Sequence, residues 1–357
     1  MSTPTFVVGT GRCGSTMLSN MLREHPKVLS LSEFFISVTD GARTPQAVEQ
    51  AFPRHAIDGP AFWRIVAGPS PYFNFQLRNG VPNPELIYPW QASTARFSLK
   101  TGIPAISLMT LPHLTEDCDG LFEILRDEVE TWPSASIERH YRQLFGWLAS
   151  HFGKALWIER SAGGLGMAQQ LLTSFPDARI VHLARDGRDA SLSMFVHMGF
   201  RHGVATIMLG QHLGVDPIVS TDRTRIDSVP AELRPFLPEE FDVARLDKFE
   251  VSPPLCGQFW TQQVESGLKI LATLPADRLL MLRYEDFFTD PKRQLDTFTA
   301  FLGEDYVDED WSFRCAATVR PPRSTWRDLP ADEARALTEA CRPGFEQLRA
   351  VGIDYEI

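Results

Sequence analysis

The stretch from Phe6 to Leu22, FVVGTGRCGSTMLSNML, constrains the fold of this chain more than any other. It opens with apolar residues that favour a buried strand, continues with Gly9, Gly11 and Gly14, and ends with an apolar helical face. A glycine loop between a strand and a helix start presents backbone N–H groups, and the helix macrodipole favours an anion there. The stretch therefore predicts a phosphate-binding loop after the first strand.

This loop differs from the nucleoside-triphosphate motif GxxxxGK[ST] at one position, because Ser15 stands where the motif has its lysine. A cation lies inside the loop instead, at Arg12. Glycine-bearing turns of this kind also occur without a ligand, so the loop alone leaves a purely structural role open.

Composition excludes several classes of protein. The 357 residues allow one large domain or two medium ones, and a net charge of −10 argues against a general nucleic-acid binder. No run of 18 apolar residues and no leader-like segment is found, which predicts a soluble, unexported, cytoplasmic protein without a transmembrane segment. The five cysteines are odd in number and lack CxxC spacing, so neither a disulfide framework nor a zinc site is expected.

A second signal is the stretch 178–194, ARIVHLARDGRDASLSM. Its pattern predicts a buried strand over 180–184, a polar turn, and a helix from residue 190. Arg185 ends the strand and Ser193 lies eight residues later, where a guanidinium and a hydroxyl can together bind a dianionic phosphate. The alternative is a helix start with an arginine that has no ligand.

The third signal is the stretch 279–303, where a predicted strand runs into RYEDF, then a DP dipeptide and a helix ending in FLG. This stretch closely resembles the region after a core strand in sulfotransferases that use 3′-phosphoadenosine-5′-phosphosulfate (PAPS). The first loop is similar to the 5′-phosphosulfate loop of that family, and Arg185 with Ser193 resembles its 3′-phosphate motif. The resemblance covers about 6–33 and 157–327.

The resemblance implies a PAPS site without a metal ion, since a sulfonate carries less charge than a phosphoryl group. Arg12 would also act in catalysis, by stabilising charge on the leaving nucleotide. Tyr284 would lie near the adenine, and Arg323 or Arg320 would reach the 3′-phosphate. The implied nucleotide-binding residues are Gly11, Arg12, Cys13, Gly14, Ser15, Thr16, Arg185, Ser193, Tyr284 and Arg323.

Two residues are candidates for the general base. Glu33 stands near the end of the predicted second strand, 29–35, where some branches of the family have a carboxylate beside the sulfonate. A solvated carboxylate at a strand end is the alternative. His113 is the second candidate, because other branches take a histidine base from this part of the chain, although a lone histidine is more often structural. Arg160 would either assist the sulfonate or the acceptor, or form a plain structural ion pair.

The order of predicted elements implies an α/β fold with a mainly parallel central sheet and helices on both faces, and a P-loop-like phosphate-binding loop after the first strand. We expect a single sulfotransferase-like domain over 1–357, with acceptor-facing insertions around 36–120 and 200–257. Ligands of such sheets bind beyond the carboxyl ends of the strands, where Arg12 and Arg185 would both lie.

The predicted reaction is in-line transfer of the PAPS sulfonate to a hydroxyl or amine, with help from a general base. The expected acceptor is a small molecule, a glycan or a lipid, and not a nucleic acid. A P-loop nucleotide kinase or ATPase is the alternative enzyme. A catalytically inactive nucleotide-binding protein is the alternative outside enzymes.

Overall fold

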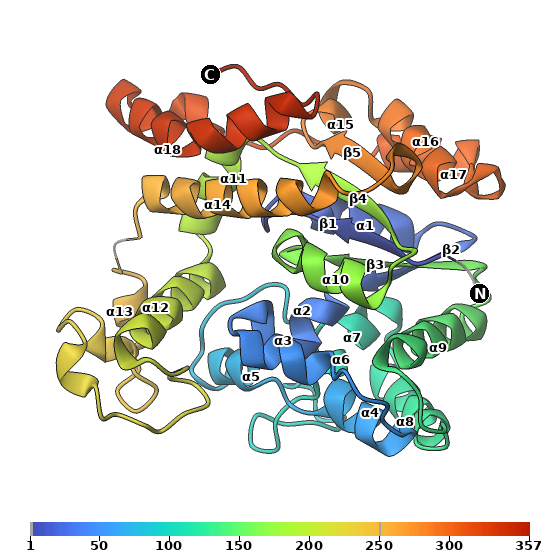
Figure 1. Ribbon diagram of the computed structural model, residues 1–357, viewed down its shortest axis with the longest axis horizontal. Coiled ribbons are helices and arrows are strands. Elements are labelled where there is room, and N and C mark those ends of the chain that lie inside the picture. Colours follow the sequence, from blue (N-terminus) through green and yellow to red (C-terminus); the bar gives the residue numbers. More distant parts are fainter. Residues whose placement is uncertain (1–2, 250) are drawn as a thin grey trace. The chain divides into compact units, whose positions relative to one another are not determined.

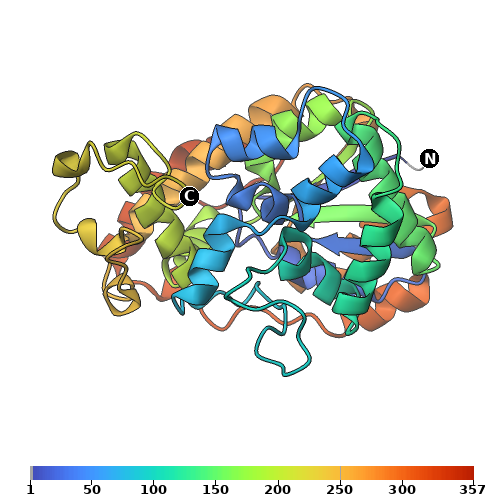
Figure 2. The same ribbon diagram turned by 90° about the horizontal axis from the view of Figure 1, so that it is seen from below.

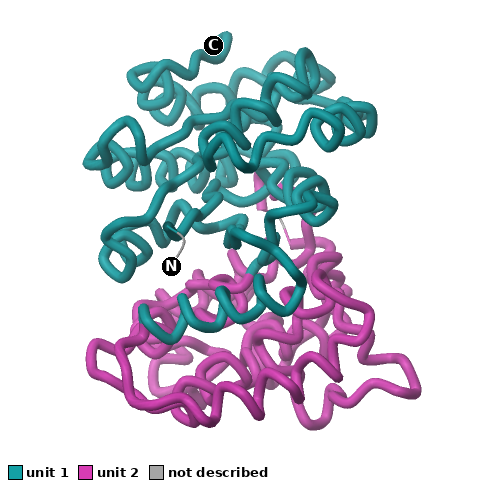
Figure 3. Tube along the Cα trace, turned by 90° about the vertical axis from the view of Figure 1, so that its right-hand side faces the viewer, with its two compact units in different colours: residues 1–33, 138–193, 253–357 teal, residues 34–137, 194–252 magenta. Residues whose placement is uncertain are grey.

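The computed structural model describes residues 3–249 and 251–357. The chain forms two compact units, which Figure 3 shows in different colours. Unit 1 comprises residues 1–33, 138–193 and 253–357, and unit 2 comprises 34–137 and 194–252. The two segments of unit 2 overlap the insertions expected around 36–120 and 200–257, and a single functional domain over 1–357 stays a prediction.

Unit 1 is built on a five-stranded sheet in the order β2-β3-β1-β4-β5. Every pair of neighbouring strands is parallel, which confirms the predicted α/β fold class. Because the strands are parallel, the loops that follow β1 and β4 leave the same edge of the sheet. The strands are β1 (Thr5–Val8), β2 (Val28–Ser32), β3 (Leu156–Ser161), β4 (Arg179–Ala184) and β5 (Leu279–Arg283).

Helices cover both faces of this sheet (Figures 1 and 2). On one face Val7 belongs to a core with buried residues of α1 (Ser15–Arg23), α16 (Pro291–Leu302) and α17 (Glu309–Ala316). On the other face the Phe6 ring lies 5.1 Å from Phe175, which follows α10, and 6.1 Å from Trp157, which also meets Phe145 of α9. The alternation of Phe6 and Val7 is that of a strand buried on both sides.

The helices of unit 1 connect the strands and extend past β5. They are α1 (Ser15–Arg23), α9 (Ile137–His151), α10 (Ala168–Ser174), α11 (Gly187–Phe195), α14 (Pro253–Leu271), α15 (Asp286–Thr289), α16 (Pro291–Leu302), α17 (Glu309–Ala316) and α18 (Ala331–Ala350), of which α9 and α11 begin or end in unit 2. Short 3₁₀ turns are η2 (Gly164–Met167), η5 (Ala276–Arg278), η6 (Glu304–Tyr306) and η7 (Trp326–Asp328). Helices α14 and α18 pack together, with the Trp260 and Phe345 rings 5.1 Å apart.

Described residues of unit 2 form helices and loops and contain no strand of the sheet. The helices are α2 (Phe34–Val38), α3 (Pro45–Ala51), α4 (Gly59–Ala67), α5 (Pro71–Arg78), α6 (Ala105–Leu108), α7 (Thr110–Leu114), α8 (Cys118–Val129), α12 (Met198–Leu213) and α13 (Val243–Leu246), with 3₁₀ turns η1 (Asp40–Ala42), η3 (Ile226–Ser228) and η4 (Arg234–Phe236).

Three expectations about local structure were wrong. The second strand ends at Ser32, and Phe34 and Phe35 begin α2. Helix α5 lies inside 68–110, which the Pro- and Gly-rich sequence predicts to be irregular; Pro71 stands in its first turn, where proline is tolerated, and the Ser70 hydroxyl caps it. Helix α12 begins at Met198 and continues into 200–254, a Pro-rich stretch whose sequence predicts irregular structure. Its glycines lower helix propensity, but buried residues such as Leu209 anchor it.

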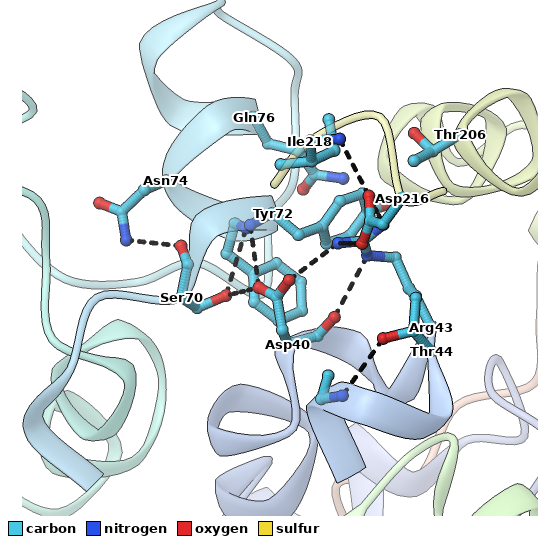
Figure 4. A network of polar contacts seen from close by, with 12 residues as sticks. Asp40, Arg43, Thr44, Ser70, Tyr72, Asn74, Gln76, Thr206, Asp216 and Ile218 are labelled. Atoms are coloured by element: carbon cyan, nitrogen blue, oxygen red, sulfur yellow. Dashed lines mark hydrogen bonds and ion pairs between the residues drawn. The ribbon is translucent and has the colours of Figure 1, made fainter. Parts of the chain in front are cut away.

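A buried polar network ties the two segments of unit 2 together (Figure 4). Arg43 Nη2 lies 2.8 Å from Asp40 Oδ2 and 3.0 Å from Asp216 Oδ2, and its guanidinium lies over the Tyr72 ring at 4.2 Å. The Asp40 carboxylate also accepts hydrogen bonds from the Ser70 hydroxyl and from the Tyr72 backbone N–H. Asp40 and Arg43 come from the first segment and Asp216 from the second, so one arginine joins both.

Among the described residues, no helix combines the length and apolar character that crossing a membrane requires.

Candidate functional site

The loop between β1 and α1 has the backbone of an anion-binding turn. Gly11 and Gly14 have φ of 79° and 87°, which is the left-handed region that glycine adopts without strain. Gly11 N donates to the Ala162 carbonyl at 2.7 Å, which fixes the loop against the end of β3. Gly14 is the N-cap of α1 and has no side chain to cap the first turn, so no N-cap side chain satisfies the N–H groups at the helix start, where the macrodipole places a partial positive charge.

Arg12, Arg185 and Ser193 meet beside this loop. Arg12 Nε donates to Ser193 Oγ at 3.1 Å, and Arg185 Nη1 donates to the Arg12 carbonyl at 2.7 Å. In the described residues Arg185 Nε is buried and has no hydrogen-bond partner. A buried guanidinium N–H without an acceptor is costly, and a bound anion would satisfy it. These groups therefore fit a phosphorylated ligand.

Tyr284 packs against both the loop and Arg185. The Arg185 guanidinium lies 4.9 Å from the centre of the Tyr284 ring, and a Cβ placed on Gly14 would be 2.0 Å from Tyr284 Cε2. Only glycine permits this approach at position 14. Burial raises the pKa of Tyr284, so its hydroxyl stays protonated near neutral pH.

Arg160 links the helix start to Glu33. It donates from Nη1 to Glu33 Oε1 at 2.5 Å and to Ser15 Oγ at 3.3 Å, and from Nη2 to Ser32 Oγ. The other carboxylate oxygen of Glu33 accepts from the Ala162 N–H at 2.9 Å. Glu33 is 5% exposed and Arg160 2% exposed, so this is a buried ion pair and not a solvated carboxylate at a strand end.

Backbone strain marks two of the predicted site residues. Arg12 and Glu33 have φ of 55° and 54°, in the left-handed region that costs an L-residue about 1–2 kcal/mol. Only two other non-glycine residues of the described chain, Asp40 and Ala42, have positive φ. Strained residues of this kind persist where surrounding contacts hold them, and they gather at functional sites.

The remaining predicted residues occupy different surroundings. Thr16 is exposed on α1, and Cys13 is buried beneath the loop, where burial raises the pKa of its thiol. Arg323 is exposed in the segment between α17 and η7, and no hydrogen bond of the described structure joins it to the loop. His113 is buried on α7 in unit 2, whereas the other predicted residues belong to unit 1.

Sequence reasoning missed the contacts that surround Arg185. The first turn of α11, close after β4, contains a second arginine, Arg188, which is buried and pairs with Asp186. The repeated Arg-Asp in RDGRD was the available signal, but no local pattern links it to Glu356, which is far away in sequence and whose carbonyl accepts from Arg188 Nη2. No cluster of three or more His, Cys, Asp or Glu side chains suited to a metal ion occurs within 3–249 and 251–357.

Fold and site define an α/β protein whose first strand is followed by a glycine-bearing loop and a helix start. Residues 167–315 match the model of the family described as "Sulfotransferase domain", which confirms the predicted resemblance over this part of the chain. The matched part contains Arg185, Ser193 and Tyr284, whereas the first loop and Glu33 lie outside it. The match supports a transferase that moves sulfonate groups.

Solved structures to which the chain is similar include three sulfotransferases or sulfotransferase domains. One from Alicyclobacillus acidocaldarius is 17% identical, with a TM-score of 0.44 and coverage of 100% of this chain and 98% of the other. The sulfotransferase domain of the Synechococcus PCC 7002 olefin synthase is 16% identical, with a TM-score of 0.42 and 95% of both chains covered. A sulfotransferase from Mycobacterium avium is 17% identical, with a TM-score of 0.42 and coverage of 99% and 78%. No curated protein matches the chain.

Proposed function

We propose that this protein transfers the sulfonate of PAPS to a hydroxyl or amine of an acceptor. The observation that carries the proposal is the meeting of Arg12, Arg185 and Ser193, drawn from two strand-to-helix turns at the same edge of the sheet. The family match of residues 167–315 supports the same reaction.

The loop and its arginines would hold the nucleotide. The N–H groups at the start of α1, with Ser15 and Thr16, face the 5′ side of the ligand, and Arg12 supplies the cation that the absent loop lysine would otherwise supply. Arg185 and Ser193 would bind the 3′-phosphate, with the buried Arg185 Nε as the donor that lacks a partner in the described residues. The ring of Tyr284, which already lies over Arg185, would border the adenine.

PAPS supplies an activated sulfonate: its sulfur–oxygen bond to the nucleotide breaks, the nucleotide keeps the electron pair, and the acceptor oxygen or nitrogen forms the new bond to sulfur. The residues of the chain then have two tasks. Arg12 and the loop N–H groups stabilise the charge on the leaving phosphate oxygen. A base takes the proton of the acceptor.

Glu33 is our first candidate for that base. Its two oxygens are held by Arg160 Nη1 and by the Ala162 N–H, which orients the carboxylate beside Ser15 at the start of α1. His113 is the second candidate, from unit 2, whose segments we propose to recognise a small-molecule, glycan or lipid acceptor.

Calorimetric titration with 3′-phosphoadenosine-5′-phosphate (PAP), ADP and ATP tests the nucleotide. PAP should bind much more tightly than ADP, and Arg185→Ala should remove most of the difference, about ten- to a hundredfold for a charge-assisted bond to a buried group. Equal affinity of the unmodified protein for PAP and ADP would overturn the assignment.

Turnover separates the remaining alternatives. Sulfonate transfer from PAPS to a panel of phenols, amines and sugars supports the enzyme, and PAP binding without any transfer supports an inactive nucleotide-binding protein. Tight binding of ATP with Mg²⁺-dependent hydrolysis would instead favour the P-loop kinase or ATPase, against which the serine at position 15 already argues.

A further inference from the structure

The segment from Arg185 to Asp189, which joins β4 to the first turn of α11, is held by a second arginine. Arg188 is 1% exposed, and it donates from Nε to Asp186 Oδ1 at 3.0 Å and from Nη2 to Asp186 Oδ2 at 2.7 Å. The Arg188 backbone N–H also donates to Asp186 Oδ1, at 2.9 Å. A bidentate ion pair of this kind fixes the direction of both side chains as well as their distance.

Two aromatic rings from later parts of the chain pack on Arg188. Its guanidinium lies 3.7 Å from the centre of the Trp326 ring and 4.9 Å from that of Phe345 on α18. The Trp326 backbone N–H donates to Asp189 Oδ1 at 2.7 Å, which ties the segment around Trp326 to the first turn of α11. Stacking on aromatic rings is a role that arginine fills and lysine does not.

The segment 353–356 makes two hydrogen bonds to this region, one to Arg188 and one to Glu285. The Glu356 carbonyl accepts from Arg188 Nη2 at 2.8 Å, and the Tyr355 hydroxyl donates to Glu285 Oε2 at 3.0 Å. Glu285 Oε1 in turn accepts from the Asp186 N–H at 2.9 Å. Tyr355 is 3% exposed, and burial raises its pKa well above the ordinary value, which keeps its hydroxyl a donor. Two series of hydrogen bonds therefore link this segment to Asp186, one through Arg188 and one through Glu285.

These contacts determine the position of Arg185. The Asp186 N–H belongs to the peptide that follows Arg185, and Glu285 holds it. On the other side, Ala184 is paired with Arg283 in the sheet, and its carbonyl accepts from Tyr284 N at 2.8 Å. With the backbone fixed on both sides, the Arg185 side chain reaches the Arg12 carbonyl.

We propose that the segment 353–356, acting through Glu285 and Arg188, positions Arg185 and thereby sets the preference of the protein for nucleotides that carry a 3′-phosphate. The inference rests on the proposed function, because it assumes that Arg185 binds that phosphate. Tyr355, Glu285 and Arg188 are positioning residues, since they act on the nucleotide through Arg185.

Tyr355→Phe is the sharpest test, because it removes one hydroxyl and keeps the ring. Calorimetry with PAP and ADP should show about a fivefold to tenfold loss of PAP affinity, within the range of an ordinary hydrogen bond, and unchanged ADP affinity. Tyr88→Phe is the matched control. It also removes a tyrosine–carboxylate bond, from the Tyr88 hydroxyl to Asp119 Oδ1 at 2.8 Å in unit 2, and it should change neither affinity.

A double-mutant cycle separates positioning from general loosening. In an Arg185→Ala background, Tyr355→Phe should have no further effect on PAP affinity, because the group that it positions is gone. Arg188→Lys, which keeps the charge and loses the bidentate ion pair with Asp186, should lower PAP affinity as Tyr355→Phe does. Independent effects of Tyr355→Phe and Arg185→Ala would overturn the inference, and so would equal losses of PAP and ADP affinity.

The inference and the proposed function fail in different ways. An unmodified protein that does not distinguish PAP from ADP overturns the proposed function, and this inference with it. A preference for PAP that survives intact in Tyr355→Phe overturns this inference alone.

Discussion

Gly14→Ala should destabilise the protein far more than Gly11→Ala, although both glycines lie in the same loop. Their φ values are 87° and 79°, so the backbone cost of an L-residue is the same for both, about 1–2 kcal/mol. A Cβ at position 11 would meet no atom within 4 Å, whereas one at position 14 would lie 2.0 Å from Tyr284 Cε2. Moving the Tyr284 ring adds the cost of overpacking, about 1–3 kcal/mol. We expect total losses of about 1–2 and about 2–5 kcal/mol.

Urea unfolding followed by circular dichroism measures both variants, with the slope m compared to confirm that the same surface is exposed. Tyr284→Ala supplies the internal control, because Gly14→Ala made in that background should cost no more than Gly11→Ala does alone. Gly14→Ala should also weaken PAP binding, since the displaced ring is the one that lies over Arg185. Equal destabilisation by Gly11→Ala and Gly14→Ala would refute the packing argument.

Three further outcomes are expected. Glu33→Gln should lower turnover by about 10²–10⁴-fold while PAP affinity stays unchanged, and His113→Gln should cost less; the reverse order would move the base to His113. Burial lowers the pKa of His182 to about 4, so between about pH 6.5 and pH 4 the unfolded state binds a proton that the folded state does not. The free energy of unfolding should therefore fall on acidification by up to about 1.4 kcal/mol per pH unit. His182→Leu should flatten this slope, and an unchanged slope in urea titrations would contradict the reasoning. Arg43→Met leaves Asp40 and Asp216 buried without their cation, at a cost of about 3–5 kcal/mol, so limited proteolysis should cut unit 2 faster, and an unchanged rate would argue against the network.

Strands and their flanking turns could be predicted because their signals are local. Phe6 to Val8, Ile180 to Ala184 and Leu279 to Arg283 are short apolar runs bounded by glycine or charged residues, and each is a strand of the sheet. Helix α12 escaped prediction because its glycines weaken its own propensity and its stability comes from tertiary packing around Leu209. Its partner residues in that core, such as Phe236, are not adjacent to it in sequence.

The residues of the candidate site could likewise be predicted only where the signal is local in sequence. Arg12 and Arg185 could be proposed from turn chemistry, because each follows a strand and precedes a helix. The environment of Glu33 could not, since its partner Arg160 lies 127 residues away and only the pairing of β2 with β3 brings them together. The same limit hid Arg188, whose partners Trp326, Phe345 and Glu356 all come from the last part of the chain.

Arg185 connects the two turns that the sequence treats as separate motifs. Its Nη1 donates to the carbonyl of Arg12, the strained residue of the first loop, and so stabilises a left-handed conformation that would otherwise relax. Arg12 in turn donates to Ser193, which follows Arg185 on the next helix. Each turn therefore helps to hold the other. A lysine at position 185 could donate to the Arg12 carbonyl, but it has no counterpart of the Arg185 Nε–H, because all of its donors lie on a single atom. The geometry of the site thus favours arginine at position 185 even before any ligand is bound.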